Sequence, residues 1–202
     1  MDFFVWALLA GVGIHFVNKG EQARRIALLG KHLGHYHVEN LMEQVTEGYL
    51  RALDTTDPDR RDQIWAALTA AEQELSKQFS RFVADFAGVY GEHARVSRLP
   101  FAFPRAAQVF PRASFDLRKL LAVHGNAIAR IVANEKGLNN RDKAFVLTAE
   151  LYLMQHSCHW FCKSKNVASV RLLMRHKTSY EQVLEAVTDE TREAYLKVIY
   201  TP

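Results

Sequence analysis

The stretch LMQHSCHWFCKS, residues 153–164, gathers two histidines and both cysteines of the chain into about three helical turns. Imidazole and thiolate groups are the side chains that zinc and haem iron accept as ligands. The stretch therefore offers a set of metal or haem ligands on one element. The four candidates are His156, Cys158, His159 and Cys162.

Helical geometry divides these four side chains between two stripes. At about 100° per residue, Cys158 and Cys162 share one stripe, whereas His156 and His159 share another. A complete zinc site would need further ligands from a second helix, and the sequence holds no second CxxC or HxxxH pair to supply them. The stretch is first interpreted as the crowded middle of a buried helix, with a metal- or haem-binding sensor as the alternative.

Sequence patterns typical of catalytic sites are missing from the chain. It has no GxSxG elbow, no Walker A loop, no GxGxxG fingerprint and no HExxH pair. Cys162 and His159 come nearest to a nucleophile and its base, but neighbouring side chains on one helix point outward rather than at each other. We expect a protein without chemistry of its own, and no cofactor unless zinc or haem is held at the residues above.

The segment from residue 3 to residue 17 is the most unusual part of the sequence, because His15 is its only polar member. A membrane span takes about 20 apolar residues, whereas stretches of about 10 to 14 usually belong to soluble cores, so its length lies between the two classes. Two alternatives stay open: attachment to a membrane or a partner chain, and burial in a core or a homodimer seam. The residues that would make the attachment are Phe3, Phe4, Trp6, Leu8, Leu9, Ile14 and Phe16.

The charges around this segment are asymmetric. Asp2 stands where a signal peptide would have basic residues, which argues against a cleaved leader. Four basic residues follow the segment, namely Lys19, Arg24, Arg25 and Lys31. If the segment enters a membrane, the positive-inside rule places the rest of the chain on the cytoplasmic face.

Two cysteines only four residues apart are poorly placed for a disulfide and indicate reduced thiols, as in the cytoplasm.

A second basic region covers residues 95–119, where six basic side chains accompany one acid, Asp116. Phe101, Phe103, Phe110 and Phe115 are interleaved with them. Such a segment can contact lipid headgroups or nucleic acid, or its phenylalanines can fold inward beneath the arginines. The candidate anion contacts are Arg95, Arg98, Arg105, Arg112, Arg118 and Lys119.

The elements that must position these residues are all predicted to be helices, since helical periodicity recurs along the chain and no alternating run is long enough for a strand. Three prolines turn residues 91–113 into one long connection. The segment 140–164 is apolar around nearly its whole circumference, which predicts the buried centre of the bundle. The other expected helices cover about 38–53, 58–90, 114–134, 180–187 and 189–199.

The 202 residues thus predict one all-α domain, a single bundle of six to eight helices. Residues 1–18 form a hydrophobic N-terminal helix and residues 19–202 the helical domain. We expect a binding or scaffolding protein that attaches to a membrane, a protein partner or a second copy. The net charge of +4 permits an anionic partner without requiring one, so a nucleic-acid-binding protein is a further alternative, after the metal- or haem-binding sensor.

Overall fold

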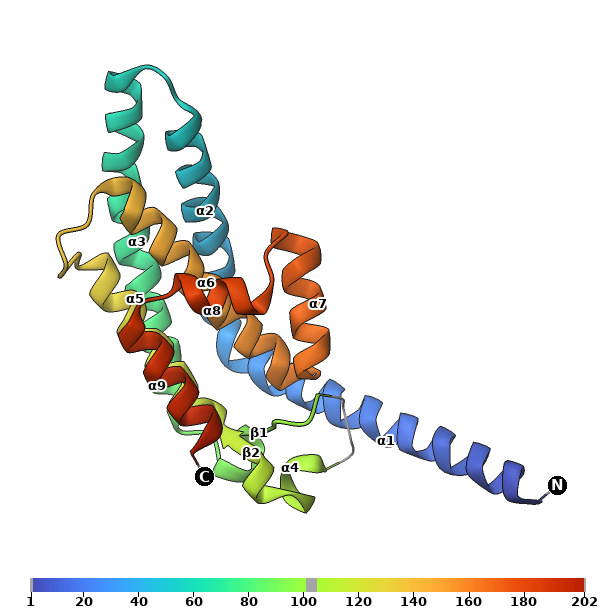
Figure 1. Ribbon diagram of the computed structural model, residues 1–202. Helices are drawn as coiled ribbons and strands as arrows, with labels where there is room; N and C mark the ends of the chain where they lie inside the picture. Colours follow the sequence, from blue (N-terminus) through green and yellow to red (C-terminus); the bar gives the residue numbers. More distant parts are fainter. Residues whose placement is uncertain (1, 101–104, 202) are drawn as a thin grey trace.

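The computed structural model describes residues 2–100 and 105–201, and the side chains from residue 16 onward. This part of the chain forms nine α-helices, two short 3-10 helices and a sheet of two strands (Figure 1). The predicted all-α bundle is confirmed. The number of helices exceeds the predicted six to eight because the long connection contains a helix of its own, the four-residue α4 (Ala106–Val109).

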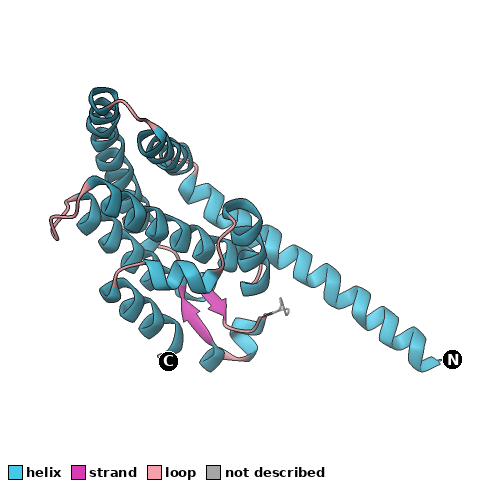
Figure 2. Cartoon of the chain, turned by 45° about the horizontal axis from the view of Figure 1, so that its top comes forward, coloured by secondary structure: helices cyan, strands magenta, loops and turns pink. Residues whose placement is uncertain are grey.

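The first helix, α1 (Asp2–Leu33), is a single element of 32 residues that continues through residue 18 without interruption. Its first half extends away from the bundle, and only its second half lies along α3 and α6 (Figures 1 and 2). Leu29 of this second half is buried, and Leu28 and Leu33 pack against the same core. The apolar N-terminal half of α1 is therefore the part of the helix that projects from the bundle (Figure 1).

The next two helices, α2 (Val38–Asp54) and α3 (Pro58–Ala87), form an antiparallel pair that makes one end of the molecule (Figure 1). The predicted start of α3 is confirmed, because the Asp57 carboxylate accepts hydrogen bonds from the backbone N–H groups of Asp59 and Arg60, and Pro58 occupies the first turn. A stripe at helical spacing turns inward from α3 and is buried: Leu68, Leu75, Phe79, Phe82 and Phe86.

The long connection folds back on itself through a sheet that the sequence did not predict. Strand β1 (Arg95–Ser97) pairs antiparallel with β2 (Ser114–Asp116), with Val96 opposite Phe115. The 3-10 helices η1 (Gly91–Ala94) and η2 (Pro111–Ala113) flank the two strands. Both Val96 and Phe115 are buried, and the Phe115 ring meets Trp160 edge-on at 5.0 Å between centroids. The sheet thereby closes the connection against the bundle.

Helix α6 (Asn140–Cys162) is the centre of the bundle, as predicted, and it packs against α1, α2, α5, α7, α8 and β1. Its N-cap Asn139 accepts a hydrogen bond from the backbone N–H of Asp142 at 2.9 Å. Helix α5 (Leu117–Val132) lies beside it and buries Leu120, Leu121 and Ile128. Helix α6 ends at Cys162, and Ser164 caps the separate helix α7 (Lys165–His176).

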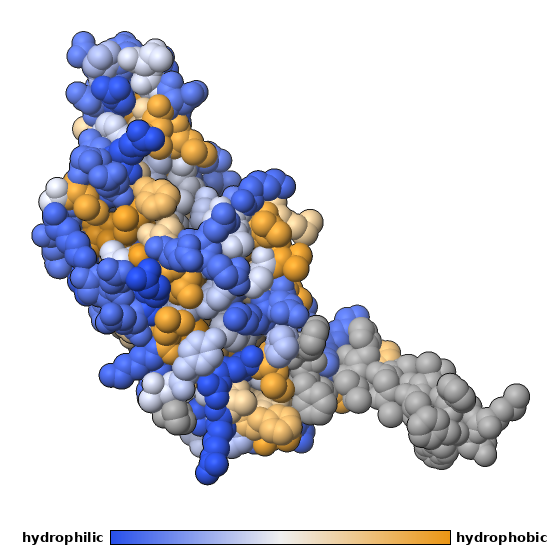
Figure 3. Space-filling view, viewed as in Figure 1, coloured by the Kyte–Doolittle hydropathy of each residue, from blue (hydrophilic) through white to orange (hydrophobic). Residues whose placement is uncertain are grey.

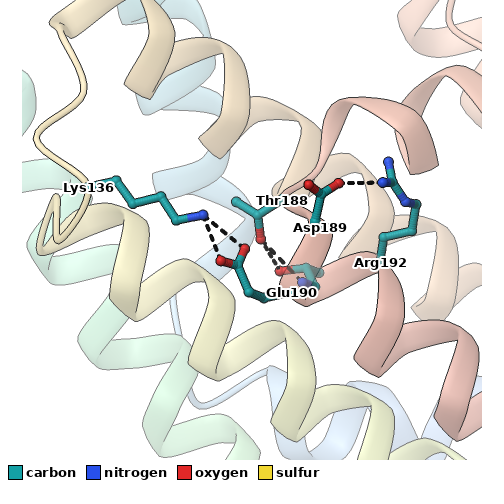
Figure 4. Close-up of polar contacts among 6 residues, drawn as sticks. Lys136, Thr188, Asp189, Glu190 and Arg192 are labelled. Atoms are coloured by element: carbon teal, nitrogen blue, oxygen red, sulfur yellow. Dashed lines mark hydrogen bonds and ion pairs between the residues drawn. The ribbon is translucent and has the colours of Figure 1, made fainter.

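The chain closes with α8 (Tyr180–Ala186) and α9 (Asp189–Tyr200), both at about the predicted positions. Ser179 and Gln182 form the predicted capping box. Thr188 caps α9 as expected, and Lys136 forms an ion pair with Glu190 at 2.7 Å that ties the turn after α5 to the start of α9 (Figure 4). This hydrogen bond from Lys136 lowers the pKa of the Glu190 carboxyl to about 2.

Apolar side chains remain on the surface of the bundle at several places. Figure 3 shows hydrophobic surface over α2 and over α7. Leu50 of α2 is 69% exposed and Met174 of α7 is 70% exposed. Among the helices in the described part of the chain, none has the length and apolar character needed to cross a membrane.

Candidate functional site

A pocket of about 260 Å³ lies at the place where α1 leaves the bundle, which we call the α1 foot pocket. One wall is α1 from Val17 to Leu28, and the others come from η1 and from the start of α4. The polar side chains that line it are Glu21, Arg24, Arg25, Glu92, His93, Arg105 and Gln108. Three guanidinium groups thus face two carboxylates in one cavity.

Glu21 is fully engaged by its neighbours in this pocket. Its Oε1 atom accepts a hydrogen bond from Nη2 of Arg25 at 2.5 Å, and its Oε2 atom accepts one from the backbone N–H of Arg105 at 2.8 Å. Arg25 is also fixed, because Nη1 donates to the carbonyl of Phe161 at 3.2 Å and the guanidinium lies 5.6 Å from the centre of that ring. These contacts tie α1 to both α6 and the connection.

The side chains of Arg24 and Arg105 have no hydrogen bond or ion pair with any residue that the structure describes. Arg105 has φ 53° and ψ 26°, the left-handed region, which is unfavourable for a residue other than glycine by about 1 kcal/mol. The Glu21 carboxylate compensates for this backbone strain by accepting the amide of the same residue. The fold therefore holds Arg105 beside Arg24 without neutralising either guanidinium.

Arg118, predicted as an anion contact, is used inside the protein. Its Nε and Nη2 atoms donate to the Asp116 carboxylate at 3.1 and 2.6 Å, and Nη1 donates to the carbonyl of Val89 at 2.9 Å. The hydrogen bonds to Asp116 raise the pKa of the guanidinium. This arrangement joins the start of α5 to the end of α3, and it leaves little of Arg118 for an external anion.

The other predicted anion contacts are distributed over β1, the connection and α5. Arg98 donates to the carbonyl of Arg112 and lies over the ring of Tyr200 at 5.8 Å. Arg95 in β1, Arg112 in η2 and Lys119 in α5 are exposed. Of the six residues, only Arg105 lines the α1 foot pocket. Phe101 and Phe103, which the sequence pattern includes, lie outside the described residues.

Three of the four predicted metal ligands line a second pocket, of about 370 Å³, between α1, α2, α3, α6 and α7. Cys158, His159 and Cys162 line it, but His156 does not: its Nε2 atom lies 3.1 Å from Oγ of Ser169 in the interior. The four candidates therefore do not converge. In the described ranges, no three His, Cys, Asp or Glu side chains are placed to hold a metal ion together.

Burial also disfavours the thiolate form of the two cysteines in the protein without a bound metal. Burial raises the pKa of Cys158 far above its usual value and that of Cys162 to about 11, so both stay protonated near neutral pH. Burial lowers the pKa of His159 to about 4, which keeps its imidazole neutral. The sulfur atoms of Cys158 and Met154 lie 4.0 Å apart, and the pocket is otherwise mainly apolar.

A buried polar cluster between α5, α6 and α9 was not predicted. Ser157 donates to the carbonyl of Leu153 at 3.0 Å, so its oxygen must accept the hydrogen bond from Nε2 of His124 at 2.9 Å. Nδ1 of His124, Oη of Tyr195 and both carboxylate oxygens of Glu150 have no hydrogen-bond partner among the described residues. Burial lowers the pKa of His124 to about 3 and raises that of Glu150 to about 7.

All four of these side chains are fully buried, so we attribute a structural role to this cluster. The sequence did contain one signal for it, because a carboxylate on a helix that is apolar around its circumference must be buried.

Comparison with protein-family models, curated proteins and solved structures found no match for this chain.

Proposed function

We propose that the protein is a non-catalytic binding protein whose helical bundle is attached to a membrane by the apolar first half of α1. The sequence of residues 3–17 has one polar member, and these residues form the part of α1 that extends beyond the bundle (Figure 2). This combination of apolar sequence and projecting backbone is the observation that carries the proposal.

The free-energy cost of exposing this apolar segment to water supports its burial in a membrane. Burial of one large apolar side chain is worth about 1.5 to 3 kcal/mol. Exposing the side chains of the seven predicted attachment residues to water would together cost roughly 10 kcal/mol or more of free energy. Six of them have side chains outside the described residues, and the seventh, Phe16, is 66% exposed.

The segment is long enough to enter a bilayer but too short to cross its hydrocarbon core. Fifteen helical residues extend about 22 Å, against about 30 Å for the hydrocarbon core of a bilayer. Lys19 and Arg24 follow on the same helix, where long basic side chains can reach the polar headgroups. The first charged turns of α1 would then lie at the membrane surface, and the bundle would begin directly above it.

A full-length chain with Leu8→Glu and Leu9→Glu tests the proposal, with Leu50→Glu and Leu53→Glu as the matched control. Both pairs add two carboxylates at apolar positions, but Leu50 and Leu53 are exposed on α2, away from α1. We expect the wild type and the control to sediment with membranes and to float with phosphatidylcholine vesicles. The Leu8 and Leu9 variant should remain in the soluble fraction.

Circular dichroism should give the same helix content and thermal midpoint for both variants. Vesicle binding that is equal in all three proteins would contradict the proposal. If the Leu8 and Leu9 variant loses only self-association, as measured by sedimentation velocity, the cover is a second copy of the chain and the membrane proposal is wrong.

A further inference from the structure

We infer that the α1 foot pocket binds the phosphate of an anionic phospholipid headgroup beside the inserted helix. This inference rests on the proposed membrane attachment and adds the lipid that the attached bundle selects.

The position of the pocket matches the level of the headgroups. Its α1 wall begins at Val17, the last residue of the apolar segment, and reaches Leu28. Arg24 lies about 10 Å along the helix beyond Val17 at 1.5 Å per residue. Side chains on a helix lean toward its N-terminus, which is the direction of the membrane in this arrangement. Its guanidinium can therefore reach back toward the lipid surface.

The free charge of the pocket is positive because its carboxylates are outnumbered and one of them is already used. Glu21 is bound by Arg25 and by the backbone amide of Arg105. Among the described residues that line the pocket, Glu92 is the one remaining carboxylate against the two guanidiniums of Arg24 and Arg105. An anion that enters the pocket would pair with cations that the described part of the protein leaves unpaired.

The chemistry of the two arginines selects phosphate. Each guanidinium presents five N–H donors in a rigid plane and can form two parallel hydrogen bonds to phosphate oxygens. Gln108 adds an amide to the same wall. A cavity of about 260 Å³ has room for a headgroup phosphate with its glycerol. Arg24 comes from α1 and Arg105 from the connection, so a bound phosphate would bridge two elements far apart in sequence.

The pocket is also organised before any ligand arrives. The hydrogen bond from the Arg105 amide to Glu21, and that from Arg25 to the Phe161 carbonyl, fix the connection and α6 to α1. A site held in this way loses less conformational entropy when it binds. Phosphate is equally the group of a free anion, but the place of the pocket at the end of an apolar helix favours the lipid source.

The test is flotation of the full chain with vesicles of phosphatidylcholine alone and of phosphatidylcholine with phosphatidylglycerol. The variant Arg24→Gln with Arg105→Gln removes both guanidiniums. Arg60→Gln with Arg61→Gln removes the same charge at the start of α3, at the opposite end of the bundle (Figure 1). We expect wild type and control to bind the anionic vesicles more tightly than the neutral ones. The Arg24 and Arg105 variant should lose roughly 30-fold in affinity for the anionic vesicles alone.

A second variant, Arg24→Lys with Arg105→Lys, keeps the charge and removes the planar donors. We expect it to lose a measurable part of the preference for anionic vesicles, and full retention would show that general charge attraction explains the binding. Inorganic phosphate, at an ionic strength matched with chloride, should displace the wild type only weakly. Complete displacement by low concentrations of phosphate would identify a site for free phosphate and overturn the lipid assignment.

The outcomes separate this inference from the proposed function. Wild type that floats equally with both kinds of vesicle overturns the headgroup site but leaves the attachment by α1 in place. An equal loss of binding in the Arg24 and Arg105 variant and in the Arg60 and Arg61 control also overturns the site. Wild type that floats with neither kind of vesicle overturns the attachment and the headgroup site together.

Discussion

Replacement of Glu150 by glutamine should make the protein more stable above neutral pH. Glu150 is fully buried on α6, and neither carboxylate oxygen has a hydrogen-bond partner among the described residues. Burial raises the pKa of this carboxyl to about 7, although polar contacts from the Thr191 hydroxyl and the Thr188 backbone, too poor in geometry to count as hydrogen bonds, and the charge of Arg130 limit the rise. Glutamine keeps the shape of the side chain but cannot ionise.

The magnitude follows from the pKa values of the folded and unfolded states. The pKa rises from 4.5 in the unfolded chain to about 7 in the folded one. Each unit of difference corresponds to about 1.4 kcal/mol, which gives about 3 kcal/mol in all. The folded state binds more protons between these two values. The stability contributed by protonated Glu150 is therefore complete below pH 4.5 and is lost as the pH rises through 7.

The assay is urea denaturation of wild type and Glu150→Gln across this pH range, followed by tryptophan fluorescence. His124 and His156 titrate in both proteins, so the difference between the two unfolding free energies isolates Glu150. We expect this difference to grow in favour of the variant by about 3 kcal/mol from pH 4.5 to pH 8. Glu43→Gln, on an exposed face of α2, should show no such trend. A difference that does not change with pH would refute the reasoning, because it would show a carboxylate in contact with solvent or a cation.

Three other substitutions or reactions test separate parts of the structure. Burial raises the pKa of Cys162 to about 11, so about one thiol in 1,000 is ionised at pH 8. Thiol reagents should modify it far more slowly in the native protein than in urea, and equal rates would contradict its burial. Trp160→Phe removes the N–H donor to the carbonyl of Ser97 at 2.9 Å and should cost about 1 to 3 kcal/mol in urea unfolding. A cost near zero would mean that water replaces this bond. Lys143→Met leaves buried Glu72 without its cation and should cost about 3 kcal/mol. Adding Glu72→Gln should recover most of this loss, and failure to recover it would show that packing of Lys143 is what matters.

Local signals in the sequence were sufficient for most helix boundaries. Asp57 with Pro58, and Ser179 with Gln182, act through hydrogen bonds within a few residues, so the pattern alone identifies them. The central place of α6 also follows from local information, because its apolar circumference requires burial on every side.

Elements too short to show a repeating pattern were missed. Strands β1 and β2 have three residues each, too few for an alternation of apolar and polar residues to be recognised. The boundary expected at residue 18 marks a change of hydropathy rather than the end of a helix. Because charged residues such as Glu21 and Arg25 stabilise a helix when they are four residues apart, α1 continues to Leu33.

The candidate sites were only partly accessible to sequence reasoning. The set of four possible metal ligands divides differently from the predicted stripes, because His156 turns inward to Ser169 whereas His159 reaches the pocket with both cysteines. The α1 foot pocket joins Arg24 to Arg105 through the long connection. No local pattern relates two residues so far apart in the chain, so only the folded arrangement brings them together.

The continuous course of α1 has a mechanical consequence. A helix of 32 residues is a rod of about 48 Å, and it has no break at which its two halves could bend independently. Membrane helices adopt tilts that depend on the thickness and composition of the bilayer. A change in tilt of about 10° would swing the far end of such a rod through about 8 Å. In an attached chain, a change in bilayer thickness would thus be transmitted through α1 as a displacement of the bundle relative to the membrane surface.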